Sequence, residues 1–279
     1  RQMCIRDSNC NWFLITLGCR RGLTFLEQQS EVDGKRLGIR GHSMGGNLTM
    51  YVAGSDSRVK VASPSVGGSG YRTYARYGLL PQIRKIKGGL ELFRRTMGYQ
   101  FYAPRITAPL LHLGASNDFH GQMDATYATG ARVSKKVPQR FVFAPHFNHR
   151  FYPEQQVARI LWLDQHLKGG MKLPETPVSE LKLKPIPVLR VTPSKGLPVN
   201  RVDIYYSIAP DSRARFWRDA GARQDGKNWA AQLPVMELKR PLFAFANAGI
   251  PFNDISPVSY THLRAHETEA DLVCRLLLE

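Results

Sequence analysis

Residues 36–46 read Arg36-Leu-Gly-Ile-Arg-Gly-His-Ser-Met-Gly-Gly46, so that a short apolar segment runs directly into Gly-x-Ser-x-Gly. Leu37 and Ile39 alternate with polar neighbours, which predicts a strand. The apolar residues Leu48, Met50, Tyr51 and Val52 predict a buried helix that ends near Gly54. A serine between such a strand and such a helix lies on a sharp turn that lifts its hydroxyl above the sheet. The stretch therefore predicts a nucleophile elbow within an α/β fold.

Ser43 is the predicted nucleophile of this elbow. The turn needs residues without bulk two positions before and two positions after the serine, where Gly41 and Gly45 stand. The amide of Met44 opens the following helix and could donate one hydrogen bond to an oxyanion. A bare Gly-x-Ser-x-Gly is common by chance, but its strand-turn-helix setting favours nucleophilic acyl transfer over an ordinary Gly/Ser turn.

An acid and then a histidine should follow this serine, each directly after a later strand. The apolar run 109–114 predicts a buried strand, and Asp118 follows it as the candidate acid. Residues 140–145 predict the next strand, and His146 and His149 come after it. We favour His149 as the base because its Asn-His-Arg-Phe setting lies just before a helix, and His146 is the alternative.

In this interpretation Ser43 attacks an ester carbonyl, and His149 takes its proton and returns it to the leaving alcohol. Asp118 would fix the tautomer of the imidazole ring and stabilise the imidazolium. His112 lies inside its predicted strand and is expected in the core.

Both ends of the chain resemble translated sequencing adapters. Residues 1–8 correspond to the end of a transposon-based adapter, and residues 258–279 correspond to a reverse adapter followed by index and flow-cell sequence. We therefore expect both segments to be adapter-derived rather than native, and to make few buried contacts with the body.

Composition excludes several classes of protein. The net charge is +17, and leaving out the ends, which carry +1 and −2, raises it to +18. Outside these ends only Cys10 and Cys19 remain, so neither a disulfide framework nor a metal-binding cysteine cluster is expected. No apolar run approaches the roughly 18 residues of a membrane span. Nucleic acid is not an expected partner, because no recognition motif accompanies the charge.

The pattern along the chain predicts two domains. Residues 12–31 and 155–167 have helical spacing, and residues 59–67 predict a further strand of the first domain, 9–172. A proline-rich stretch then leads to short alternating runs, which predict a β-sandwich over residues 173–257. Its predicted strands fall at 188–191, 202–208, 215–218, 228–233 and 241–247. The segment 69–106 is long, basic and rich in tyrosine, and it is expected to form either a lid over the site or a set of crossover helices.

The first domain resembles the carboxyl half of an α/β-hydrolase of the dienelactone hydrolase, acetyl xylan esterase and prolyl oligopeptidase-like grouping. The resemblance rests on the elbow 41–46, on Gly114-Ala-Ser-Asn-Asp118 and on Asn148-His149-Arg-Phe. It implies a parallel sheet followed by a partial, truncated β-sandwich, with Ser43, Asp118 and His149 as nucleophile, acid and base.

The implied function is a serine esterase acting on an acylated sugar or another small ester, without metal or organic cofactor. A prolyl oligopeptidase-type serine peptidase is the first alternative. An inactive hydrolase scaffold that binds acidic polysaccharide is the second. By resemblance we expect a secreted or periplasmic protein. We also expect the 279-residue chain to be truncated at its amino end and nearly inactive, because the loop that supplies a second oxyanion donor is expected upstream.

Overall fold

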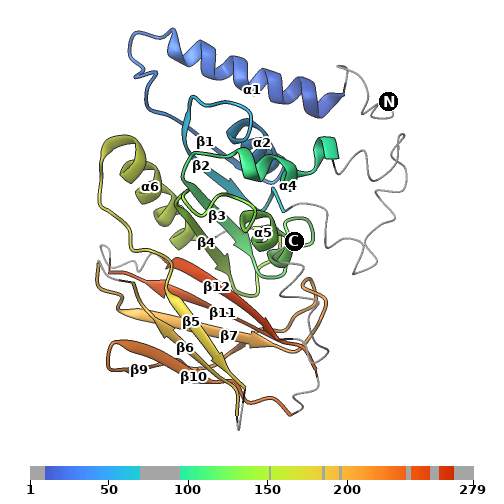
Figure 1. Ribbon diagram of the computed structural model, residues 1–279, viewed down its shortest axis with the longest axis vertical. Coiled ribbons are helices and arrows are strands. Elements are labelled where there is room, and N and C mark those ends of the chain that lie inside the picture. Colours follow the sequence, from blue (N-terminus) through green and yellow to red (C-terminus); the bar gives the residue numbers. More distant parts are fainter. Residues whose placement is uncertain are drawn as a thin grey trace.

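The structure is a computed structural model. It describes residues 10–69, 95–150, 152–183, 186–194, 197–236 and 240–251, and the backbone of residues 258–266. Within these residues the chain forms an α/β unit followed by two antiparallel sheets (Figure 1). The fold class expected from the sequence, a parallel hydrolase-type sheet followed by a partial sandwich, is confirmed.

The α/β unit is built on a four-stranded sheet in the order β1-β2-β3-β4, in which every neighbouring pair is parallel. Because all four strands run the same way, their carboxyl ends meet at one edge of the sheet. The strands are β1 (Leu37–His42), β2 (Val59–Ser65), β3 (Leu110–Ala115) and β4 (Gln139–Ala144). The helical segments are α1 (Asn11–Glu27), α2 (Met44–Ala53), α4 (Tyr99–Tyr102), the 3₁₀ turn η2 (Ala103–Arg105), α5 (Met123–Gly130) and α6 (Pro153–Lys168).

Helices bury both faces of this sheet, as is usual for a parallel sheet. On one face Ala62 and Leu110 pack in a cluster with residues of α1, α2 and α4. On the other face Leu111 and Leu113 pack against α6, whose Trp162 is completely buried. The middle strands β2 and β3 therefore contribute side chains to both clusters.

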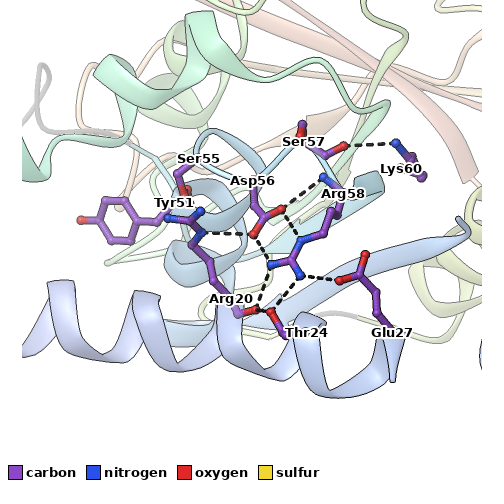
Figure 2. Close-up of polar contacts among 9 residues, drawn as sticks. All are labelled: Arg20, Thr24, Glu27, Tyr51, Ser55, Asp56, Ser57, Arg58 and Lys60. Carbon is purple, nitrogen blue, oxygen red and sulfur yellow. Dashed lines mark hydrogen bonds and ion pairs between the residues drawn. The ribbon is translucent and has the colours of Figure 1, made fainter. Parts of the chain in front are cut away.

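An ion-pair network fastens α1 to the turn between α2 and β2 (Figure 2). Asp56 accepts hydrogen bonds from Arg58 Nη2 at 2.7 Å and from Arg20 Nε at 3.1 Å, and Arg58 Nη1 pairs with Glu27 at 2.6 Å. The Asp56 side chain is only 3% exposed, and the guanidinium of Arg58 holds the pKa of its carboxyl well below the usual range. The network joins the helix that precedes the elbow strand to the start of β2.

The second unit consists of two four-stranded antiparallel sheets, in the orders β5-β6-β10-β9 and β12-β11-β7-β8. Between them lies an apolar cluster that includes Leu189, Ile204 and Ala246. The strands are β5 (Val178–Lys182), β6 (Val188–Thr192), β7 (Arg201–Ser207), β8 (Arg218–Asp219), β9 (Arg223–Asp225), β10 (Asn228–Gln232), β11 (Leu242–Gly249) and β12 (Val258–His266).

A shared aromatic core joins the two units. Phe141 and Phe143 of β4 pack with Trp217, Phe243 and Phe245 of the sandwich. Buried Asn247 of β11 also donates a hydrogen bond to the carbonyl of Phe143 at 3.0 Å. The sandwich is therefore packed directly against the sheet that carries the predicted site.

The structure differs from the sequence analysis at the end of the sandwich. Residues 258–266, expected to contact the body little, pair along β11 as strand β12, which also lies against β4. Backbone hydrogen bonding to an open strand edge requires no selected side chains, so this pairing is compatible with any origin of the segment. The domain boundaries and the adapter origin stay predictions, and residues 1–9 and 267–279 lie outside the described residues.

The run 215–218, expected to form a strand, is mostly loop, and β8 begins only at Arg218. Arg215 instead turns into the interior, where an ion pair overrides the local alternation. Most of the predicted excursion 69–106 lies outside the described residues, so neither interpretation of it is decided. No helix in the described part of the chain is long and apolar enough to cross a membrane.

Candidate active site

Ser43 lies on the turn between β1 and α2, in a backbone conformation that non-glycine residues rarely adopt. Its φ of 56° and ψ of −115° place it in the strained region expected of a nucleophile elbow. The turn is held by the Ser43 amide, which donates to Ser65 of β2 at 2.9 Å, and by the Asn47 amide, which donates to Ser43 at 3.1 Å. The hydroxyl is thereby presented at the carboxyl edge of the sheet.

The glycines around Ser43 are not equally constrained. A Cβ atom on Gly41 would lie 2.2 Å from the backbone of Gly45, so position 41 requires glycine. A Cβ atom on Gly45 itself would meet nothing within 4 Å, whereas one on Gly46 would lie 2.6 Å from the carbonyl oxygen of Ser65. The expectation that Gly45 is a steric requirement is wrong. The requirement falls on Gly46, because that residue faces the backbone of β2.

This difference predicts opposite effects of two alanine substitutions. Gly41→Ala should lower the free energy of unfolding by about 3 kcal/mol or more, because the elbow backbone must move to admit the methyl group. Gly45→Ala should leave it unchanged or raise it by about 0.5–1 kcal/mol, since alanine is favoured over glycine within a helix. Urea unfolding of both variants measures this. A stable Gly41→Ala variant, or an unfolded Gly45→Ala variant, would contradict the steric argument.

The structure brings Ser43, His149 and Asp118 together at this edge. His149 Nε2 lies 2.7 Å from Ser43 Oγ, and His149 Nδ1 lies 3.1 Å from each carboxylate oxygen of Asp118. With the ring proton on Nδ1, the imidazole donates to Asp118 and accepts from the Ser43 hydroxyl. The three residues come from the segments after β1, β3 and β4, as the sequence analysis expected for its candidates.

The carboxylate of Asp118 is enclosed and fixed by its own loop. Its side chain has no exposed surface, while the His149 side chain is 20% exposed. Besides His149, Oδ1 accepts hydrogen bonds from the amides of His120 and Gly121, both at 2.7 Å. These two donors hold the carboxylate in one orientation toward the imidazole ring.

Aromatic rings surround the open side of His149. The ring centroids of His42, Phe119 and His120 lie 5.6, 5.2 and 5.4 Å from that of His149. Phe119 is 47% exposed, so it forms part of the rim that meets solvent. Burial, and secondarily the neighbouring charge of His149, lower the pKa of His42.

The other two histidines of the sequence analysis lie in different surroundings. His146 has a φ of 62°, its amide donates to Ser116 Oγ at 2.9 Å, and its ring lies 5.8 Å from that of Phe216 in the sandwich. His112 is buried in β3 and stacks on Phe141 with ring centroids 4.5 Å apart. Its burial confirms the expected place of His112 in the core, and the same burial lowers its pKa to about 4.

All non-glycine residues with positive φ in the described part of the chain lie just beyond the carboxyl ends of strands. Ser43 follows β1, Val66 follows β2 with a φ of 44°, and His146 follows β4. Strained backbone of this kind persists only where surrounding contacts over-determine it, and it concentrates at functional sites. Nothing in the sequence pattern indicated the strain at Val66 or His146.

Met44 is the first residue of α2, so its amide belongs to the first turn, whose amides have no acceptor within the helix. Its role as an oxyanion donor stays a prediction. Among the described residues, no group of three or more His, Cys, Asp and Glu side chains is arranged to hold a metal ion.

The fold and this constellation define the chain as an α/β-hydrolase of the serine hydrolase class. Residues 19–170, more than half of the chain, match the model of the prolyl oligopeptidase family. The chain belongs to this family. The match covers every strand of the parallel sheet together with Ser43, Asp118 and His149.

Several named proteins are similar to parts of this chain. The acetyl esterase Axe7A of Xylanibacter ruminicola is 25% identical over 171 residues, which cover 58% of this chain and 38% of that protein. An acetyl xylan esterase from Paenibacillus sp. R4 gives a TM-score of 0.49 at 21% identity, over 58% of this chain and 55% of that one. The acylaminoacyl peptidase of Pyrococcus horikoshii gives 0.45 at 22% identity, over 60% and 29%. The chain thus spans well under two thirds of these proteins.

Proposed function

We propose that this chain carries the reaction centre of a serine hydrolase that cleaves a carboxylic ester, with an acylated sugar or another small ester as substrate. The observation that carries the proposal is the continuous hydrogen-bonded path from Ser43 Oγ through His149 to the enclosed carboxylate of Asp118. The named activity of Axe7A, an acetyl esterase, favours a short acyl group.

The proposed reaction begins when His149 Nε2 takes the hydroxyl proton as Ser43 Oγ attacks the ester carbonyl. Asp118 holds the ring and stabilises the imidazolium, and the amide of Met44 donates to the developing oxyanion. His149 then protonates the leaving alcohol, which departs and leaves an acyl group on Ser43. Water, deprotonated by His149, releases the acid and restores the serine.

A serine peptidase is the second candidate, because the family takes its name from a peptidase and the same three residues would serve. The two activities differ in the bond they break, since the amine of an amide is a poorer leaving group than an alcohol. A site that cleaves amides must therefore deliver the proton to nitrogen in the transition state.

Parallel assays separate these candidates. A short-chain nitrophenyl ester and a prolyl nitroanilide are offered to the full-length protein. Hydrolysis of the ester without the anilide is the expected result. Comparable kcat/KM on the anilide would assign a peptidase. A folded full-length protein that cleaves neither substrate would favour the inactive scaffold, to be tested next for binding of acidic polysaccharide.

A further inference from the structure

The segment between β7 and β8 of the sandwich, residues 208–217, contacts the loop that carries Asp118. Its anchor is Arg215, whose side chain has no exposed surface. The guanidinium makes a two-pronged ion pair with Asp124 in the first turn of α5, with Nη2 and Oδ2 2.7 Å apart. It also donates to the carbonyl of Ala209 at 2.9 Å and lies 3.6 Å from the ring centroid of Phe243.

Such an enclosed ion pair fixes geometry more than it adds stability. Removing two charges from water is costly, and apolar residues of similar volume often stabilise a protein as well. The two-pronged contact of the Arg215 guanidinium fixes the position of the main chain in the loop 208–217. Asp124 lies six positions after Asp118 in the chain.

The main chain of this loop accepts hydrogen bonds from Asn117, the residue directly before Asp118. Asn117 Nδ2 donates to the carbonyl of Arg215 at 2.7 Å and to that of Arg213 at 3.3 Å. The Asn117 amide donates to the carbonyl of Phe147, two residues before His149, at 3.0 Å. Asn117 therefore ties together the loop of the acid, the loop of the base and the sandwich.

We infer that Asn117, supported by Arg215, is a positioning residue that holds Asp118 in line with His149, so that the sandwich is a working part of the active site. This inference rests on the proposed function of the triad. The carboxylate contacts the ring with both oxygens at 3.1 Å, an arrangement that a small rotation of its backbone would break. Misplacement of a reacting group by about 1 Å can cost about 10²-fold in rate.

The test compares two asparagines that each bridge the same two units. Asn117→Ala in the full-length protein should lower kcat on a nitrophenyl ester by about 10–100-fold with little change in KM. Asn247→Ala removes a different bridging hydrogen bond, to the carbonyl of Phe143, and should lower the melting temperature without lowering kcat. Equal kcat losses in both variants would overturn the inference, because they would mark a general loss of domain packing.

A double-mutant cycle asks whether Asn117 acts through Asp118. In an Asp118→Ala background the Asn117→Ala substitution should have no further effect on kcat. Additive losses would overturn the inference. Arg215→Lys, which keeps the charge but cannot form the fork, should reproduce the kcat loss if Asn117→Ala proves unstable. If Asp118→Ala and Ser43→Ala both retain full activity, the proposed function itself fails.

Discussion

Replacement of Ser43 by alanine is expected to lower kcat/KM on a short-chain nitrophenyl ester by at least about 10³-fold. Ser43 Oγ is the atom that would form the acyl intermediate, and no other hydroxyl is assigned that role. Because the strained turn is set by backbone contacts to Ser65 and Asn47, the fold should survive the loss of the hydroxyl. Esterase kinetics and circular dichroism of the purified variant measure the two outcomes separately.

Ser63 in β2 offers a matched control. Its side chain is fully buried, and its hydroxyl has no hydrogen-bond partner in the described structure. Ser63→Ala should therefore leave hydrolysis intact. A fluorophosphonate probe should label the unsubstituted protein and the Ser63→Ala variant, but not the Ser43→Ala variant. Retention of more than a tenth of the activity by Ser43→Ala would remove the serine hydrolase assignment.

The parts of the fold that could be predicted are those in which local pattern and packing agree. The strand-elbow-helix segment and the buried strands at 59–67, 109–114 and 140–145 follow from short apolar runs bounded by turn residues. The candidate site could be assembled for the same reason. Parallel strands bring their carboxyl ends to one edge, so residues after three different strands become neighbours.

The parts that could not be predicted depend on contacts distant in sequence. Asn117 and Arg215 are 98 positions apart, and no periodicity links them. The alternation at 215–218 favours a strand, but the ion pair of Arg215 with Asp124 outweighs it. Likewise, Gly46 rather than Gly45 is sterically required, because β2 approaches the elbow from one side only. The sequence around the elbow does not indicate which glycine faces β2.

The choice between the two histidines after β4 predicts the second large effect. His149→Ala should lower kcat by about 10⁴-fold or more, since it removes the group within 2.7 Å of Ser43 Oγ. His146→Asn should change kcat little. Asparagine tolerates the positive φ of 62° at this position and lacks a basic ring nitrogen, so the variant tests the chemistry without adding backbone strain.

Steady-state kinetics of the two single variants and of the double variant distinguish the roles. If His149 is the base, the double variant should be no slower than His149→Ala, and added imidazole should restore part of its activity. If His149→Ala kept its activity and His146→Asn lost it, His146 would be assigned as the general base. That outcome would require a different loop conformation during catalysis, because the ring of His146 is paired with Phe216 and Tyr205 of the sandwich.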